Sequence, residues 1–338
     1  MIADERPPPR PPPRWARRFT LFAGALAIAL LAFTVHQVGP ATLARELGAI
    51  GWWFAALIAI EIVAALCDAL AISGFLGPTP PRSSFRRVLQ AQVIGRAINL
   101  VTPLASVGEA TKATLLMRDT ASSRAAAAIG RFGLAYVVIN LGLVTIGAPI
   151  CAATLDLPTW MTRTLWVGTG LAIVLVIGAT TWVQAGLLAS AVGALARLRL
   201  ISAERAAGWR DRGARFDEEL RGGGGLRGWW PALFAAISKL LQWLAAWIVL
   251  YANGAAPPLD VMAALATAGT VVNIVANIVP LGLGVAEGGT AALMAALGQP
   301  ASLGVTIALA RRAVHLVYAG FGLTLLVTVE ATPWRKRS

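Results

Sequence analysis

The sequence predicts an all-α polytopic membrane protein with about six full spans and two re-entrant helical hairpins that are related as an inverted repeat. Three observations lead to this fold class. The 338 residues are 57% hydrophobic and 13% charged, and their mean hydropathy is +0.69, far from a soluble globular composition. Apolar runs of about 20 residues alternate with loops that carry arginine. One interrupted, charged apolar segment occurs twice, in corresponding halves of the chain.

The full spans are predicted from apolar runs that are long enough, or nearly so, to cross a bilayer as helices. These runs are 19–36, 52–76, about 125–150, about 163–183, 229–251 and about 302–328. The first lacks a convincing cleavage site of small residues, so we expect a retained helix and not a removed signal peptide. Together they form a transmembrane domain, 19–328. A disordered, basic, proline- and arginine-rich tail precedes it at 1–18, and a basic tail follows at 329–338.

Arginine-rich segments predict that both termini are cytoplasmic. Segment 195–228 holds eight Arg against five acidic residues. Its Trp209, Phe216 and Leu220 share one helical face, which predicts an amphipathic cytoplasmic segment on the inner leaflet. Orientation and contact with anionic lipid therefore explain the net charge of +13, and a nucleic-acid partner is not expected. The predicted location is the inner membrane of a bacterium.

Counting the crossings predicts the two hairpins. With both ends and both arginine-rich loops inside, residues 88–118 start and end in the cytoplasm, whereas residues 260–298 start and end outside. Each segment is too short and too interrupted for two full spans. Two re-entrant hairpins that enter from opposite faces fit best. The unit of span, hairpin and span thus occurs twice in inverted orientation, in halves 52–150 and 229–328, as in many transporters.

The hairpins share a motif in which an Asn is followed by a Pro, by Gly and then by a Glu that opens a new apolar run. The first copy contains Asn99, Pro103, Gly108 and Glu109, and the second contains Asn277, Pro280, Gly282, Gly284 and Glu287. The Pro and Gly residues are the expected cause of the helix breaks. Non-helical backbone at membrane depth is tolerated only where protein buries it or where it lines a wet cavity. The hairpin tips therefore predict a polar cavity near the midplane.

Charged residues inside the membrane are the candidate site. Each costs about 3 kcal/mol on insertion scales, so those that remain usually mark a pathway. The predicted substrate pathway consists of Arg96, Asn99, Glu109, Lys112, Arg131, Asn277, Glu287, Arg311 and Arg312. Secondary candidates are Glu61, Asp68 and Lys239, for which a structural role in tying helices together is an equal alternative. Lys239 has the further option of snorkelling to the interface. For the two Asn residues, capping of freed backbone is preferred over contact with substrate.

A cavity that combines Arg and Lys with Glu suits a zwitterionic or anionic headgroup. Arg binds phosphate through two parallel hydrogen bonds, and Glu pairs with an amine. The predicted partners are therefore membrane lipids, while a homo-oligomer or association with lipid-biosynthesis enzymes stays open. No cofactor or metal is expected, because His36, His315, Cys67 and Cys151 have no ligand spacing. Gly222–Gly225 lacks the Lys-Ser/Thr of a phosphate-binding loop.

The residues of both hairpins resemble a known family. Segment 95–118, GRAINLVTPLASVGEATKATLLMR, with segment 279–294, VPLGLGVAEGGTAALM, and Arg311 resembles the transmembrane flippase-like domain of bacterial lysylphosphatidylglycerol synthases and its free-standing relatives. The resemblance covers roughly 20–328 and implies lipid translocation. Lys112 stands where relatives commonly have Arg, and Leu281 and Ala286 replace a Gly-Gly turn and a basic residue. No segment is long enough for an aminoacyl-transfer domain, so synthase activity is not expected.

These inferences predict a lipid flippase or transporter that moves a polar or anionic (glyco)phospholipid or related lipid between leaflets, and not an enzyme. Movement would be downhill or coupled to an ion. The alternative is a non-transporting scaffold or accessory protein of a lipid, hopanoid or cell-envelope pathway, which would act through segment 195–228. A membrane-embedded lipid transferase ranks below both, because no catalytic motif is recognisable.

Overall fold

The structure, a computed structural model, describes residues 14–38, 51–77, 84–102, 106–154, 159–185, 218, 229–255, 258–276, 279 and 283–331. Within these ranges the protein has 10 helices, which hold 91% of the residues, and no strand. The predicted all-α membrane class is therefore confirmed. Segment 195–228 lies outside the described residues, apart from Glu218.

Five helices in the described ranges are long and apolar enough to cross a membrane. They are α1 (Arg14–Val38), α3 (Trp53–Leu76), α6 (Ser122–Thr154), α10 (Trp229–Ala252) and α13 (Ala301–Ala331). The remaining predicted span, about 163–183, corresponds to α7 (Thr159–Ala185), whose strongly apolar part is limited to Leu165–Gly178. Because α1 begins at Arg14, residues 14–18, which the sequence placed in the disordered tail, are helical.

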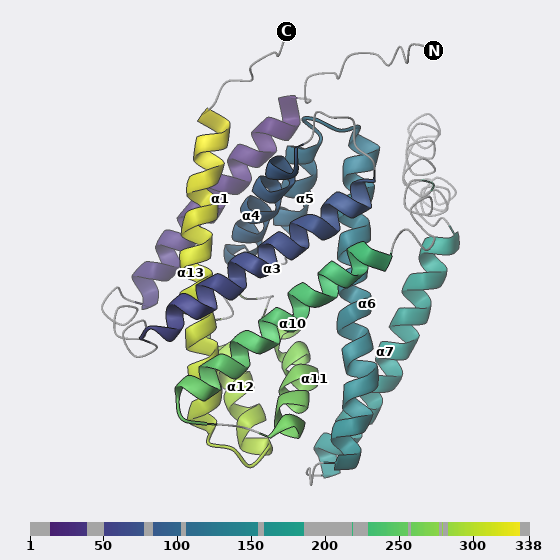
Figure 1. Cartoon of the computed structure of the whole chain (residues 1–338), viewed down its shortest axis with the longest axis vertical. Helices are drawn as coiled ribbons and strands as arrows, with labels where there is room; N and C mark the ends of the chain where they lie inside the picture. The colour runs from purple at the N-terminus through teal and green to yellow at the C-terminus, as the bar shows by residue number, and fades with distance from the viewer. Residues whose placement is uncertain are drawn as a thin grey trace, which may run out of the picture.

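Four shorter helices form two hairpins. The first consists of α4 (Phe85–Val101) and α5 (Ser106–Leu116), and the second of α11 (Leu259–Ala276) and α12 (Val285–Ala296). They contain 17, 11, 18 and 12 residues, fewer than the roughly 20 of a spanning helix. Figure 1 shows α4 and α5 in the half of the molecule nearest both termini, and α11 and α12 in the opposite half. The hairpins thus enter the bundle from opposite ends.

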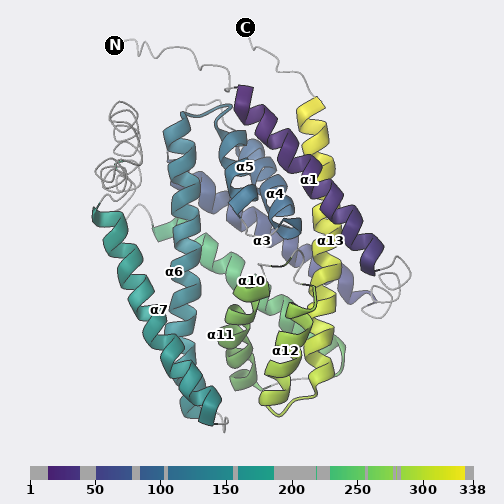
Figure 2. The same cartoon turned by 180° about the vertical axis from the view of Figure 1, so that it is seen from behind.

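The two halves of the chain repeat one another with inverted direction. Helices α3 to α6 contain 24, 17, 11 and 33 residues, and α10 to α13 contain 24, 18, 12 and 31. Helices α3 and α10 pack side by side and antiparallel across the middle of the molecule (Figures 1 and 2), with Trp53 beside Tyr251 at one end and Gly74 beside Trp230 at the other. Helix α6 runs away from the end that carries the termini, whereas α13 runs toward it. The predicted inverted repeat is confirmed.

Each hairpin is enclosed by apolar side chains. The cluster around the first hairpin includes Ile72, Ile94 and Ile98, all at most 1% exposed. The cluster around the second includes Leu250 and Met294, both at 0%. Burial in protein is the condition under which a helix break is tolerated at membrane depth, so the packing explains how the chain accommodates both breaks.

The residues predicted to break the hairpins have different roles. Four residues of the two motifs lie outside the described ranges: Pro103, Asn277, Pro280 and Gly282. Gly284 immediately precedes α12 with φ +76°, a left-handed conformation that favours glycine. The prediction that Gly108 helps to break the helix is wrong, because Gly108 lies inside α5. A Cβ at this position would be 2.0 Å from the carbonyl oxygen of Gly95 in α4, so Gly108 permits close contact between the two helices.

Ion pairs connect neighbouring helices at the end of the molecule that carries the termini. Arg118, just after α5, pairs with Glu330 near the end of α13, and Arg17 of α1 lies 3.6 Å from the same carboxylate. Arg87 at the start of α4 pairs with Asp119, which follows α5. These contacts join the first hairpin to α1 and α13 at this end.

Replacing Glu330 by Gln is expected to lower the free energy of unfolding by about 1 kcal/mol, because two arginines lose a charged partner. Since salt screens such pairs, the loss should shrink as ionic strength rises. The measurement is unfolding in detergent at low and at high salt. Arg86→Gln, an exposed change on α4, is the control. A loss that does not depend on salt would contradict an electrostatic role for Glu330.

Candidate functional site

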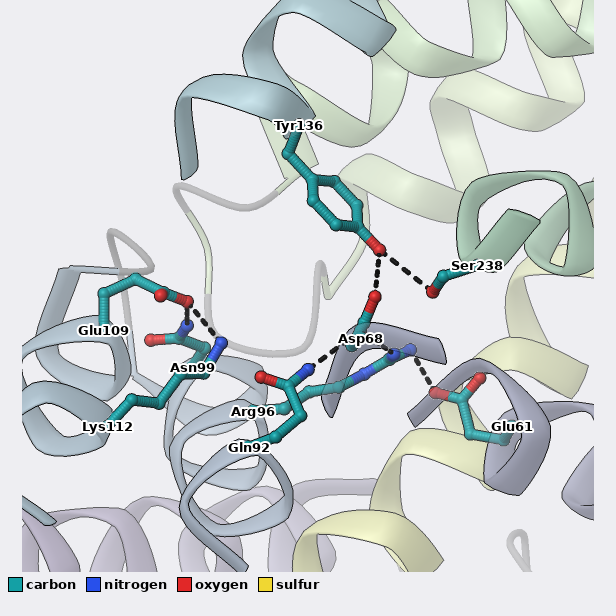
Figure 3. Close-up of polar contacts among 9 residues, drawn as sticks. All are labelled: Glu61, Asp68, Gln92, Arg96, Asn99, Glu109, Lys112, Tyr136 and Ser238. Carbon is teal, nitrogen blue, oxygen red and sulfur yellow. Dashed lines mark hydrogen bonds and ion pairs between the residues drawn. The ribbon is translucent and has the colours of Figure 1, made fainter. Parts of the chain in front are cut away.

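A polar cluster lies where α3 crosses the other helices, and Asp68 is at its centre (Figure 3). Asp68 is 2% exposed. It accepts hydrogen bonds from Gln92 Nε2 of α4 at 2.8 Å and from the Tyr136 hydroxyl of α6 at 2.7 Å. The Ser238 Oγ of α10 lies 3.0 Å from the same Tyr136 hydroxyl. One carboxylate therefore connects four helices from both halves of the repeat.

Arg96 of α4 joins this carboxylate to a second one. It forms an ion pair with Glu61, and its Nη1 lies 3.5 Å from Asp68 Oδ2. Glu61 and Asp68 are two helical turns apart on one face of α3, as the sequence predicted. The guanidinium also lies 5.3 Å from the ring centroid of Tyr318 on α13. A half-buried cation between two buried carboxylates satisfies charges that would otherwise be costly in a membrane.

The tip of the first hairpin is held by Asn99. Its Oδ1 accepts a hydrogen bond from the Gly108 N–H at 2.7 Å, as capping of a free helix N-terminus requires. Its Nδ2 donates to Glu109 Oε1 at 2.9 Å. Lys112 Nζ lies 2.7 Å from the same Glu109 oxygen and 5.2 Å from the ring centroid of Phe132. Asn99 thus both caps α5 and orients the hairpin glutamate.

The second hairpin uses a different cation. Glu287 of α12 pairs with Arg312 of α13, whereas Glu109 pairs with a lysine on its own helix. The neighbouring Arg311 donates to Asn273 Oδ1 of α11 at 2.7 Å. The two hairpin glutamates share one property: Glu109 Oε2 and Glu287 Oε2 are buried and have no hydrogen-bond partner among the residues that the structure describes. Each therefore retains one acceptor that is not used within the described fold.

Arg131 and Lys239 each contact a residue outside the two hairpins. Arg131 of α6 donates to the carbonyl oxygen of Phe75 at 2.9 Å. Because Phe75 lies at the C-terminal end of α3, this contact satisfies a terminal carbonyl and favours a cation. Lys239 of α10 is 8% exposed and lies 5.7 Å from the ring centroid of Trp243. Lys239 is therefore buried and does not snorkel to an interface.

A small cavity of about 40 Å³ adjoins the central cluster. Its polar lining is Glu61, Arg96, Gln242, Arg311 and His315. This volume holds about three water molecules and is far below the roughly 300 Å³ of a small-molecule site. The polar centre is therefore closed to a lipid headgroup in this conformation.

Sequence reasoning ranked Glu61 and Asp68 as secondary candidates, but the structure places both at the centre of the cluster. Sequence reasoning missed five polar residues of the site: Gln92, Tyr136, Ser238, Gln242 and Asn273. Gln92 had a detectable signal, since it lies four residues before Arg96 and so on the same face of α4. Tyr136, one of three tyrosines in the chain, sits within an apolar run. The contact of Ser238 and the place of Gln242 in the cavity depend on how α10 packs against the other helices, which no local pattern encodes.

Fold and site together define a multi-pass membrane protein with two opposed hairpins and a charged centre. The family model described as the lysylphosphatidylglycerol synthase TM region matches residues 20–322. The chain belongs to this family, as the residues of the two hairpins predicted. Comparison with curated proteins and with solved structures gave no significant match.

Proposed function

We propose that the protein is a lipid transporter that moves a lipid with a polar or anionic headgroup between the leaflets of a bacterial inner membrane. Both termini are cytoplasmic in this proposal, and the protein is not an enzyme. The observation that carries the proposal is the charged cluster beside the antiparallel pair α3 and α10, between two hairpins that enter from opposite ends. Discontinuous helices around a midplane site are the usual construction of transporters built from inverted repeats.

The balance of charge at the centre supports an anionic headgroup. Arg96 is matched by Glu61 and Asp68. Arg311, by contrast, binds a neutral amide, and Lys239 lies over an aromatic ring. Neither forms an ion pair with a carboxylate of the described ranges. One half-buried cation, Arg311, and one buried cation, Lys239, without a carboxylate partner in the described ranges favour a phosphate or another anion at this position, where a low local dielectric strengthens the attraction.

The hairpin glutamates supply a complementary function. The unused oxygens of Glu109 and Glu287 can accept hydrogen bonds from an amine or from hydroxyl groups. They lie at the tips of hairpins that approach the centre from the two ends, so each can act when the site is open to its own side. Rocking of the two halves about the contact between α3 and α10 would then alternate access.

The test is leaflet exchange of headgroup-labelled lipids in proteoliposomes, with phosphatidylglycerol, its aminoacyl form and glycolipids as the panel. For the preferred lipid, Arg311→Gln and the double variant Glu109→Gln with Glu287→Gln should each slow exchange by about tenfold or more, the equivalent of one charged hydrogen bond. Arg163→Gln, an exposed change on α7, should exchange as the wild type does. Exchange that is unchanged in the double variant, or absent for every lipid in a folded preparation, would favour the scaffold function instead.

A further inference from the structure

A cleft of about 380 Å³ separates parts of α6 and α11. Ile139, Leu143 and Ile146 of α6 line it, with Ala263, Ala266 and Thr267 of α11. We propose that this cleft binds an acyl chain of a membrane lipid and is the lateral opening through which the lipid of the proposed function reaches the centre. The role as a lateral opening rests on the proposed function, whereas the binding of an acyl chain is inferred from the cleft alone.

The chemistry of the lining selects an acyl chain. The only hydroxyl among these lining residues, that of Thr267, donates to the Ala263 carbonyl oxygen at 2.8 Å, so it offers little to a headgroup. Both helices lie within the membrane region, where lipid chains are the solvent that meets an apolar surface. Ile146 is 67% exposed, so the cleft is open toward that solvent. Its volume is within the range of small-molecule sites.

The cleft begins next to the polar cluster. Ile139 follows Tyr136 by three residues and so lies one turn along the same face of α6. Tyr136 donates its hydroxyl hydrogen to Asp68 at 2.7 Å. A lipid with its chain in the cleft would therefore present its headgroup near the charged centre. An apolar site next to a polar site matches a lipid, whose apolar chains are joined to a polar headgroup.

The repeat offers an internal comparison, because the pair α13 and α4 is equivalent to the pair α6 and α11. Both pairs contain a close glycine contact. A Cβ on Gly147 would lie 2.1 Å from Thr267 Oγ1, and one on Gly322 would lie 2.4 Å from the Ala97 Cβ. Beside the second contact, however, Val93 and Ala97 are 8% and 0% exposed and pack in one apolar cluster with Tyr318. The space between α13 and α4 is filled by side chains, whereas the equivalent space between α6 and α11 is open. This difference is expected for one of two alternating conformations.

The test uses the whole protein in vesicles of phosphatidylethanolamine and phosphatidylglycerol that contain phosphatidylglycerol with a diazirine in one acyl chain. After illumination, labelled peptides are mapped by mass spectrometry. Labelling should concentrate at 139–147 of α6 and 263–267 of α11. Gly142→Phe fills the cleft, and a Cβ there meets no atom within 4 Å. It should lower this labelling by about tenfold, the equivalent of excluding roughly two methylene groups. Ala266→Leu fills the same space from α11 if Gly142→Phe does not fold.

The matched control is Gly170→Phe on the exposed surface of α7, where a Cβ also meets no atom within 4 Å. It should leave the labelling of the cleft unchanged. Labelling spread evenly over α6 and α7, or unaffected by both filling variants, would overturn the site. Leaflet exchange in the same vesicles separates the two proposals. Exchange that persists when the cleft is filled overturns the lateral opening alone, whereas specific labelling without any exchange supports the chain site and overturns the transport function.

Discussion

Replacing Arg96 by alanine is expected to lower the free energy of unfolding by about 3 kcal/mol, the cost of leaving a buried carboxylate without its cation. Glu61 and Asp68, which are 7% and 2% exposed, would lose the cation that lies between them. Their mutual repulsion would then act on α3, which packs along α10 where the two halves of the repeat meet. Leaflet exchange should fall to the background of empty vesicles, because the central cluster would no longer hold its geometry.

Unfolding in detergent, followed by helical circular dichroism, measures this loss. Arg86→Ala removes a charge from the exposed start of the same helix and should change stability by less than about 0.5 kcal/mol. Combining Arg96→Ala with Glu61→Gln should recover part of the loss, since one buried charge is neutralised. An Arg96→Ala variant as stable as Arg86→Ala would show that the ion pair contributes nothing to the fold.

Replacing Gly108 by alanine is expected to destabilise the protein by about 2 kcal/mol or more, within the range of overpacking in a filled core. The new Cβ would lie 2.0 Å from the Gly95 carbonyl oxygen and 2.2 Å from Asn99 Oδ1. Because one of these atoms is backbone, α5 has to move away from α4. Asn99 would then lose its hydrogen bond to the Gly108 N–H and its hold on Glu109. Transport should fall together with stability.

Gly133→Ala is the matched control for Gly108→Ala. Gly133 lies within α6, and a Cβ there meets no atom within 4 Å. This change should leave stability unchanged or raise it by up to about 1 kcal/mol, since alanine favours a helix interior over glycine. Thermal unfolding of both variants, side by side, makes the comparison. If Gly108→Ala matches Gly133→Ala, the close contact between α4 and α5 is not required.

The membrane made much of the architecture predictable. Because every backbone group in a bilayer must find its partner within the segment, apolar length alone identifies spans. The six predicted spans correspond to helices, although α1 begins at Arg14 instead of the predicted residue 19. The two interrupted segments could not be full spans, and arginine placement then required them to enter from opposite faces. The duplicated motif of Glu109 and Glu287 predicted the family, and the motif together with the arginine placement predicted the inverted repeat.

The sequence by itself therefore determined the fold class, the hairpins and the set of charged residues within the membrane. Only the tertiary structure decided which charges meet. It placed Arg96 between Glu61 and Asp68, and it placed Gly108 against Gly95 instead of in the helix break. It also gave Glu287 a cation from α13 where Glu109 uses one from its own helix. The physical reason is that hydropathy and turn chemistry act locally along the chain, whereas the pairing of buried charges depends on which helix faces come together.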